Sequence, residues 1–404
     1  MRTPREVLFE ILSRIEPVTR GEQASLEQAV GRVLARDVIS DLDLPPFNKS
    51  AMDGFAVHAA DFGPDAAPDG SRCLPLAGES KAGVPWTTPV ARGTCVAIYT
   101  GAEVPPGADA VVMVERSQTT PAGILLRDRP QQGAHICPRG QDLRVGATVL
   151  RAGHRIRATD LALLASVGAV PVPVIARPRA TVLTTGDELV APWEKPSAGQ
   201  IRESNTQQLA ALCTLAGAQT TNLGVVRDDP ALLEQAFRAA LACCDVLITT
   251  GGVSMGRYDL VGGALQSIGV EPVVHRVAIK PGKPLWFGMA GKIPVFALPG
   301  NPVSCLVNHG VFVRPALARL SGELGSDASE RRGRWMGAPQ TQNPREQYVP
   351  VRLVPGQDGV EALEPVRWNG SADVAGISRA DAFAVIPIDT PVAPGDLLAF
   401  RPLA

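Results

Sequence analysis

The sequence predicts a multidomain α/β protein with additional β domains. Its 404 residues exceed the roughly 100 to 200 that one domain usually contains. Strand and helix patterns alternate from residue 178 to about 325, which is typical of a mostly parallel sheet covered by helices on both faces. Short alternating apolar runs broken by glycine and proline fill residues 46–141 and the last part of the chain. We therefore expect an α/β domain, an inserted small β domain and a C-terminal β-barrel.

These patterns divide the chain into four expected domains. Apolar residues at helical spacing predict a helix over residues 4–15 and a second over 26–38, before Pro45 and Pro46 end the pattern. A helical pattern at residues 159–168 leads into the proline-rich stretch VPVPVIARP, which indicates an extended edge or linker. The expected domains are a discontinuous N-terminal helical and extended domain (1–45 and 142–177), a small β domain (46–141), the α/β domain (178–325) and a β-barrel (326–404).

The charge and the cysteine content argue against several classes of protein. The net charge is -1, from 39 basic and 40 acidic side chains, so the chain lacks the basic character that binds nucleic acid or an anionic membrane. The seven cysteines are scattered and include no C-x-x-C pair, which argues against a disulfide framework or a zinc knuckle. We expect a cytoplasmic protein that has no nucleic-acid or membrane partner.

The end of one predicted strand carries the most informative segment, VLITTGGVSMGRYDL at residues 246–260. A strand that stops at Gly251 and Gly252 before a helix can present backbone N–H groups, and nearby Ser254, to a phosphate or another oxyanion. Two further junctions, VLTTGDEL at 182–189 and VFALPGNPVS at 295–304, have the same design. Parallel strands end at one edge of a sheet, so these junctions predict one ligand site.

Acidic side chains recur at these strand ends. Glu188, Asp228 and Asp259 each follow a predicted strand. Carboxylates next to a phosphate are unfavourable unless a cation lies between them, and Mg²⁺ typically binds one or two carboxylates together with substrate oxygens. The alternative for Asp228, just before Asp229 and Pro230, is the cap of the next helix.

Two further turns provide candidate contacts. IKPGKP presents Lys280 and Lys283 on a rigid turn, either as a surface feature or as a clamp on phosphate or molybdate. LPGNPVS places Pro299 and Pro302 before a helix that Asn301 or Ser304 could cap, and a rigid helix-entry loop is the alternative to a ligand role.

The segment PPFNKSAMDGFAV, at residues 45–57, holds a dense polar set that includes Asp53. This density favours a functional role over a structural loop. The position lies outside the α/β domain, which suggests a site completed from elsewhere. The five histidines show no ligand spacing, and His309 lies among apolar residues of a predicted helix.

These segments together resemble the molybdopterin molybdenumtransferase family, the bacterial MoeA proteins and the E domain of gephyrin. The resemblance covers nearly the whole chain and rests on PPFNKSAMDGFAV, TGDEL, GQIRESN, TTGGVSMGRYD, IKPGKPLWFG and LPGNPVS in this order. It implies that molybdate is inserted into adenylylated molybdopterin, with Mg²⁺-dependent release of AMP. It also implies an elongated homodimer whose α/β domain is of the molybdopterin-binding type. The site would lie between this domain of one subunit and N-terminal segments of the other, and the adenylyltransferase and apo-molybdoenzymes would be transient partners.

The resemblance also implies roles for individual residues. Expected catalytic residues are Asp53, Glu188, Asp228 and Asp259, of which Glu188, Asp228 and Asp259 would bind the metal. Expected contacts to the substrate or its phosphates are Thr100, Gly251, Gly252, Ser254, Lys280, Lys283, Pro299, Pro302, Arg139 and Ser371.

Proteins of other functional classes could use the same pocket in a different way. A carrier would hold molybdopterin without turnover. A scaffold, as in the gephyrin branch, would need partner-binding extensions, for which 404 residues leave no room. An adenylyl-transferring relative would share only the α/β domain, so the full-length resemblance argues against it.

Overall fold

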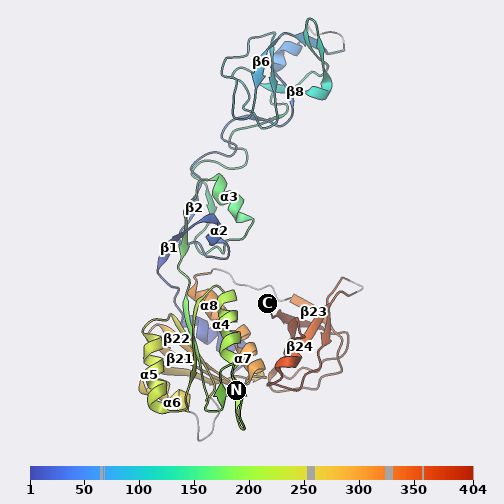
Figure 1. The fold of residues 1–404 in the computed structure, drawn as a ribbon. Coiled ribbons are helices and arrows are strands. Elements are labelled where there is room, and N and C mark those ends of the chain that lie inside the picture. Colours follow the sequence, from blue (N-terminus) through green and yellow to red (C-terminus); the bar gives the residue numbers. More distant parts are fainter. Residues whose placement is uncertain (64–66, 68, 253–259, 324–330, 357–358, 404) are drawn as a thin grey trace. The chain divides into compact units, whose positions relative to one another are not determined.

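The computed structural model describes residues 1–404 except 64–66, 68, 253–259, 324–330, 357–358 and 404 (Figure 1). The chain forms two compact units. Unit 1 consists of residues 1–36, 152–157 and 172–404, and unit 2 of residues 37–151 and 158–171. The four-domain division expected from the sequence stays a prediction. No helix in the described part of the chain combines the length and the apolar content that a membrane crossing requires.

A mostly parallel sheet forms the centre of unit 1, as predicted. Its strand order is β17-β14-β18-β22-β21-β19. The first four strands in this order pair in parallel, and β21 runs antiparallel to both of its neighbours. The bounds are β14 (Arg179–Thr185), β17 (Gln219–Val226), β18 (Val246–Thr250), β19 (Glu271–Arg276), β21 (Pro284–Ala290) and β22 (Ile293–Leu298). β21 was not predicted, because its apolar run begins at Pro284 and contains Gly288, residues that are unfavourable in a strand.

Helices cover both faces of this sheet (Figure 1). Successive residues of β18 point to opposite faces, so Ile248 packs in one hydrophobic core and Leu247 in the other. The first core is covered by α1 (Pro4–Ser13), α4 (Asn205–Leu215), α7 (Pro302–Asn308) and α8 (Arg314–Leu320), and the second by α5 (Pro230–Leu241) and α6 (Leu260–Ser267).

The N-terminal helix α1 is confirmed and packs on the α/β sheet. Thr3 and Glu6 form a capping box at its start, and Val7 and Ile11 are buried in the first core. The second expected helix, over 26–38, is wrong. Only α2 (Leu26–Ala29) forms, because Val30 leaves the helical region with a ψ of 130° and Gly31, with a φ of 75°, completes a turn in which Arg32 N donates to Ala29 O at 3.0 Å. β1 (Gly21–Ala24) instead pairs with β13 (Val172–Ile175), the extended edge predicted at VPVPVI.

The helical stretch over residues 302–320 is divided into three segments. A π-helical turn, η3 (His309–Val313), separates α7 from α8. Pro315 lacks an amide hydrogen and cannot complete the α-helical bond pattern at this point. His309 is buried in η3, and burial together with Arg314 lowers its pKa to about 3.

A closed β-barrel forms the C-terminal part of unit 1 and confirms the predicted barrel. The ring runs β24-β25-β23-β27-β26 and closes through β26 pairing with β24. Trp335 and Phe400 are buried inside. The bounds are β23 (Arg331–Trp335), β24 (Glu346–Val354), β25 (Ala362–Pro365), β26 (Ala382–Ile386) and β27 (Leu397–Pro402), with α9 (Val374–Ile377) before β26. The short strand β20 (Ile279–Lys280) pairs with β24 and joins the barrel to the α/β part.

Unit 2 contains the predicted small β domain. A four-stranded sheet has the order β6-β7-β4-β8 and a three-stranded sheet the order β5-β10-β9. Their bounds are β4 (Gly54–Val57), β5 (Arg72–Leu74), β6 (Leu76–Ser80), β7 (Cys95–Ile98), β8 (Ala110–Met113), β9 (Ser117–Thr120) and β10 (Gly123–Leu126). Unit 2 also contains β2 (Val38–Ile39), β3 (Lys49–Ser50), β11 (Ile136–Cys137), β12 (Thr148–Leu150) and α3 (Asp160–Ser166), with short 3-10 turns at Ala59–Phe62 and Val114–Arg116.

An ion-pair cluster stabilises the amino ends of the parallel strands. The Asp245 carboxylate accepts hydrogen bonds from Arg20 Nη2 at 2.6 Å and from the backbone N–H of Arg179 at 2.8 Å. Burial opposes ionisation of Asp245, but the bonds from Arg20 and Arg179 outweigh it and hold its pKa well below the usual range.

We expect Asp245→Asn to lower the free energy of unfolding at pH 7 by about 2 kcal/mol, because it removes charge-assisted hydrogen bonds. The folded pKa is depressed, so this stabilisation is fully present above the unfolded pKa of about 3.9 and is lost as pH falls toward the folded value. Urea unfolding of both proteins between pH 7 and pH 3 measures this. A difference that stays constant down to pH 3 would contradict the assignment.

Candidate functional site at the strand ends

The carboxyl ends of the parallel strands bring the predicted segments together. β14 ends at Thr185, β18 at Thr250 and β22 at Leu298, and β18 pairs directly with both of the others. Ligands of open α/β sheets bind at this edge. We call residues 185–188, 226–228, 250–252 and 298–302 the strand-end site.

The glycine turn after β18 requires glycine. Gly251 and Gly252 have φ values of 90° and 62°. A Cβ on Gly251 would lie 2.3 Å from the carbonyl oxygen of Thr185, so the turn lies directly against the end of β14. The Gly251 N–H donates to Leu298 O at 3.2 Å and is therefore not free for an anion, contrary to the expectation that the turn presents its backbone N–H groups.

Asp228 is held in the strand-end site by side-chain and backbone contacts. Its Oδ1 accepts a hydrogen bond from Thr185 Oγ1, and its backbone N–H donates to Asp187 Oδ1 at 3.3 Å. The alternative that Asp228 caps the next helix is wrong, because Asp229 is the N-cap and accepts from Leu232 N at 2.9 Å. Asp228 is exposed and its carboxylate is available to a ligand.

Glu188 lies in the loop after β14 and is exposed. Its carboxylate folds back over Gly186, where a Cβ would lie 2.7 Å from Oε2. The described residues contain no group of three or more His, Cys, Asp or Glu side chains arranged to hold a metal. Ser254 and Asp259, the remaining predicted residues of this loop region, lie outside the described residues.

Buried side chains hold the LPGNP turn in place through hydrogen bonds to its carbonyl oxygens. Pro299 O accepts from Thr250 Oγ1 and from Cys305 Sγ, each at 2.8 Å, and Gly300 O accepts from Asn205 Nδ2 at 2.7 Å. Burial raises the pKa of Cys305 to about 12, so its thiol keeps the proton that it donates. Asn205 and Cys305 were not singled out from the sequence, although Asn205 ends the quoted segment GQIRESN at the start of α4.

Ser371 joins this turn from the C-terminal part of unit 1. Asn301 Nδ2 donates to Ser371 Oγ at 2.9 Å, and Val303 N donates to Ser371 O at 3.0 Å. Asn301 occupies the N-cap position of α7, but its side chain makes no cap hydrogen bond, so the expected capping role is wrong. Pro302 is the first residue of α7, where a missing N–H costs nothing.

The KPGK turn lies against α7. Asn308 Nδ2 donates to Gly282 O at 3.1 Å and to Ser304 O at 2.9 Å. Lys280 and Lys283 flank this turn and are both exposed. Their ammonium groups are therefore free to approach an anionic ligand.

In unit 2, Asp53 and Thr100 form a pair. Asp53 Oδ1 accepts from the backbone N–H of Thr100 at 2.7 Å and from its hydroxyl at 2.8 Å. These two bonds lower the pKa of Asp53, so the carboxylate stays ionised. The sequence named both residues but gave no sign that they touch.

Arg139 is anchored in the same unit. Its Nε donates to Asp43 Oδ2 at 2.7 Å, and its backbone N–H donates to Asn48 Oδ1 at 2.8 Å. The Val145 N–H and the Arg139 guanidinium together lower the pKa of Asp43. The side chain of Arg139 is 63% exposed and can still reach a ligand.

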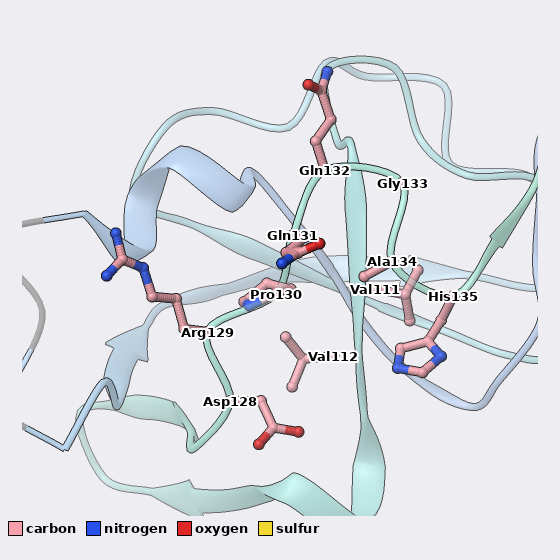
Figure 2. Close-up of a pocket in the computed structure, with 10 residues that line it drawn as sticks. All are labelled: Val111, Val112, Asp128, Arg129, Pro130, Gln131, Gln132, Gly133, Ala134 and His135. Atoms are coloured by element: carbon pink, nitrogen blue, oxygen red, sulfur yellow. The ribbon is translucent and has the colours of Figure 1, made fainter.

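A hollow of about 500 Å³ in unit 2 lies apart from all of these residues. Residues 128–135 line most of it, together with Val111 and Val112 (Figure 2). Arg129 and Gln132 extend away from it in Figure 2. None of the residues predicted to bind the ligand lines this hollow.

The fold is that of an α/β protein with exposed carboxylates and a glycine turn at the carboxyl ends of its parallel strands. Models of three domain families match the chain. They are the MoeA N-terminal region (domain I and II) at residues 2–168, a probable molybdopterin-binding domain at 181–319, and the MoeA C-terminal region (domain IV) at 336–403.

Named relatives agree with this. A molybdopterin molybdenumtransferase 2 of Mycobacterium tuberculosis is 38% identical over 80% of each chain. The molybdopterin molybdenumtransferase of a Nostoc species is 31% identical over 96% of this chain and 90% of its own. A crystal structure of a molybdopterin biosynthesis MoeA protein from Pyrococcus horikoshii covers 99% of both chains at 28% identity, with a TM-score of 0.84. The chain belongs to the molybdopterin molybdenumtransferase family.

Proposed function

We propose that this protein inserts molybdate into adenylylated molybdopterin and releases AMP. The main support is that two exposed carboxylates, Glu188 and Asp228, and the Gly251-Gly252 turn all lie at the carboxyl ends of neighbouring parallel strands. A pyrophosphate group needs this combination of a phosphate cradle and cation ligands. The names of the relatives supply the substrate class, a molybdopterin that receives molybdenum.

Mg²⁺ fits the donor set of the strand-end site. Glu188 and Asp228 offer hard carboxylate oxygens, and Mg²⁺ usually takes one or two carboxylates and completes its shell with water and substrate phosphates. We propose Glu188, Asp228 and Asp259 as its ligands. The bound ion would neutralise the charge that develops on the pyrophosphate as it is cleaved.

The chain's own groups would act by positioning and by charge. Gly252 and the residues that follow would hold a phosphate through backbone N–H groups. Thr185 orients Asp228 through its hydroxyl hydrogen bond. Exposed Lys280 and Lys283 would attract the molybdate dianion next to the LPGNP turn, where Pro299, Pro302 and Ser371 shape the site.

We further propose that Asp53, Thr100 and Arg139 contact the substrate. The ionised Asp53 carboxylate, fixed by Thr100, supports a role in holding a cation or a water. The homodimer, the cytoplasmic location and the transient contacts with the adenylyltransferase and apo-molybdoenzymes are also proposals. Seven free cysteines fit a reducing compartment, and light scattering during gel filtration would determine the oligomeric state.

The direct test is AMP release from adenylylated molybdopterin by the purified protein with Mg²⁺, with and without molybdate. We expect release that depends on Mg²⁺ and is accelerated by molybdate. If the protein tightly retains the intact adenylylated ligand under all conditions, it is a carrier of molybdopterin and not a transferase.

A further inference from the structure

Two buried side chains connect the two turns of the strand-end site. Thr250, the last residue of β18, precedes the Gly251-Gly252 turn, and Asn205 begins α4. Thr250 is 0% exposed and Asn205 is 8% exposed. Neither residue is in the set predicted to contact the ligand.

The chemistry of the acceptors fixes the direction of each hydrogen bond. Pro299 O and Gly300 O can only accept, so the Thr250 hydroxyl donates to Pro299 O at 2.8 Å and Asn205 Nδ2 donates to Gly300 O at 2.7 Å. Asn205 Nδ2 also donates to Thr250 Oγ1 at 3.1 Å. The Thr250 hydroxyl therefore donates one bond and accepts another.

These bonds join three segments that are distant in sequence. The end of β14 is connected to this network as well, because Thr184 Oγ1 donates a hydrogen bond to Thr250 O at 3.0 Å. The two turns approach closely, since a Cβ on Gly300 would lie 3.7 Å from Gly251 Cα. A shift of Thr250 would change the spacing between the glycine turn and the LPGNP turn.

We propose that Thr250 and Asn205 are positioning residues that set this spacing and thereby align the phosphate-holding turn with the molybdate-facing turn. The inference rests on the proposed function of the strand-end site. Misplacing reacting groups by up to one ångström lowers the reaction rate more than it lowers the stability of the fold. The network thus predicts an effect on turnover that exceeds the effect on stability.

Thr250→Val tests this, because valine has nearly the same shape and lacks the hydroxyl. In the variant Pro299 O keeps Cys305 Sγ and Asn205 Nδ2 keeps Gly300 O, so only the second N–H of the Asn205 amide loses its acceptor. We expect it to fold. Its kcat/KM for AMP release should fall by about 10- to 100-fold, mainly through kcat. Thr250→Ser retains the hydroxyl and should recover most of the activity.

Thr249→Val is the matched control. Thr249 precedes Thr250 in β18, is fully buried, and its hydroxyl has no hydrogen-bond partner among the described residues. The same chemical change there should leave kcat/KM unchanged. Asn205→Ala provides a second route, and its effect should be less than additive with Thr250→Val because both residues act on the same turn.

The outcomes separate the two claims. A folded Thr250→Val or Asn205→Ala variant with kcat/KM within twofold of the parent would overturn the positioning role and leave the proposed function intact. An equal loss in Thr249→Val and Thr250→Val would also overturn it, since the loss would then follow from polarity in the core. A parent protein without turnover would contradict the proposed function itself.

Discussion

Glu188→Gln will lower AMP release by about 100-fold or more, while the fold is retained. The substitution keeps the size of an exposed side chain and removes only the negative charge proposed to hold Mg²⁺. Loss of one electrostatic contact to a developing charge typically costs about 10²- to 10³-fold in kcat. Because a weaker metal site can be partly refilled, the rate of the variant should rise at high Mg²⁺ concentration.

Neighbouring residues provide controls for this prediction. Glu194→Gln makes the same change at another exposed glutamate of the same loop region and should be silent. Asp228→Asn should lose activity as Glu188→Gln does. Asp229→Asn should not, because asparagine caps a helix about as well as aspartate. Full activity of Glu188→Gln and Asp228→Asn at limiting Mg²⁺ would remove these carboxylates from the site.

Gly251→Ala will have the largest effect on stability among substitutions at the strand-end site. The residue has a φ of 90°, and its Cβ would lie 2.3 Å from Thr185 O. A non-glycine residue in such a backbone region costs about 1–3 kcal/mol, and the contact with rigid backbone adds to this. The turn must move, so AMP release should be lost together with stability.

Thermal unfolding and AMP release measure the two effects of Gly251→Ala. Gly263→Ala is the control: a Cβ there meets nothing within 4 Å, and the residue lies in α6, where alanine stabilises a helix by about 1 kcal/mol. A Gly251→Ala protein as stable and active as the parent would mean that the glycine turn is not needed in this conformation.

The α/β sheet, its flanking helices and the barrel could be predicted from the sequence, because burial leaves a periodic pattern. Ile248 and Leu247 are buried in opposite cores of the sheet, so β18 is a short apolar run that ends at the Gly251-Gly252 turn, as is typical of a strand buried on both faces. β21 is also a continuous buried run, but it begins at Pro284 and contains Gly288, which are unfavourable in a strand. The helix that the apolar spacing favoured after Leu26 ends at Val30, where the chain enters a turn completed by Gly31.

The candidate site was predictable only in part. Glycines and carboxylates after strands indicated the strand-end site, because parallel strands end at one edge. The partner of each side chain depends on contacts between distant segments, which no local pattern contains. The Thr185 hydroxyl donates a hydrogen bond to Asp228, whereas Asp229 caps α5. The Thr100 hydroxyl donates to Asp53, which is 47 positions away in the sequence.

Molybdenum insertion by this protein can be observed through the activity of an enzyme that needs the product. The most direct measurement incubates the protein with adenylylated molybdopterin, Mg²⁺ and molybdate, and then assays activation of a cofactor-free molybdoenzyme. We predict activation that needs all three additions and accompanies stoichiometric AMP release. AMP release without any activation at saturating molybdate, or activation that is the same when the protein is omitted, would show that this protein does not insert molybdenum.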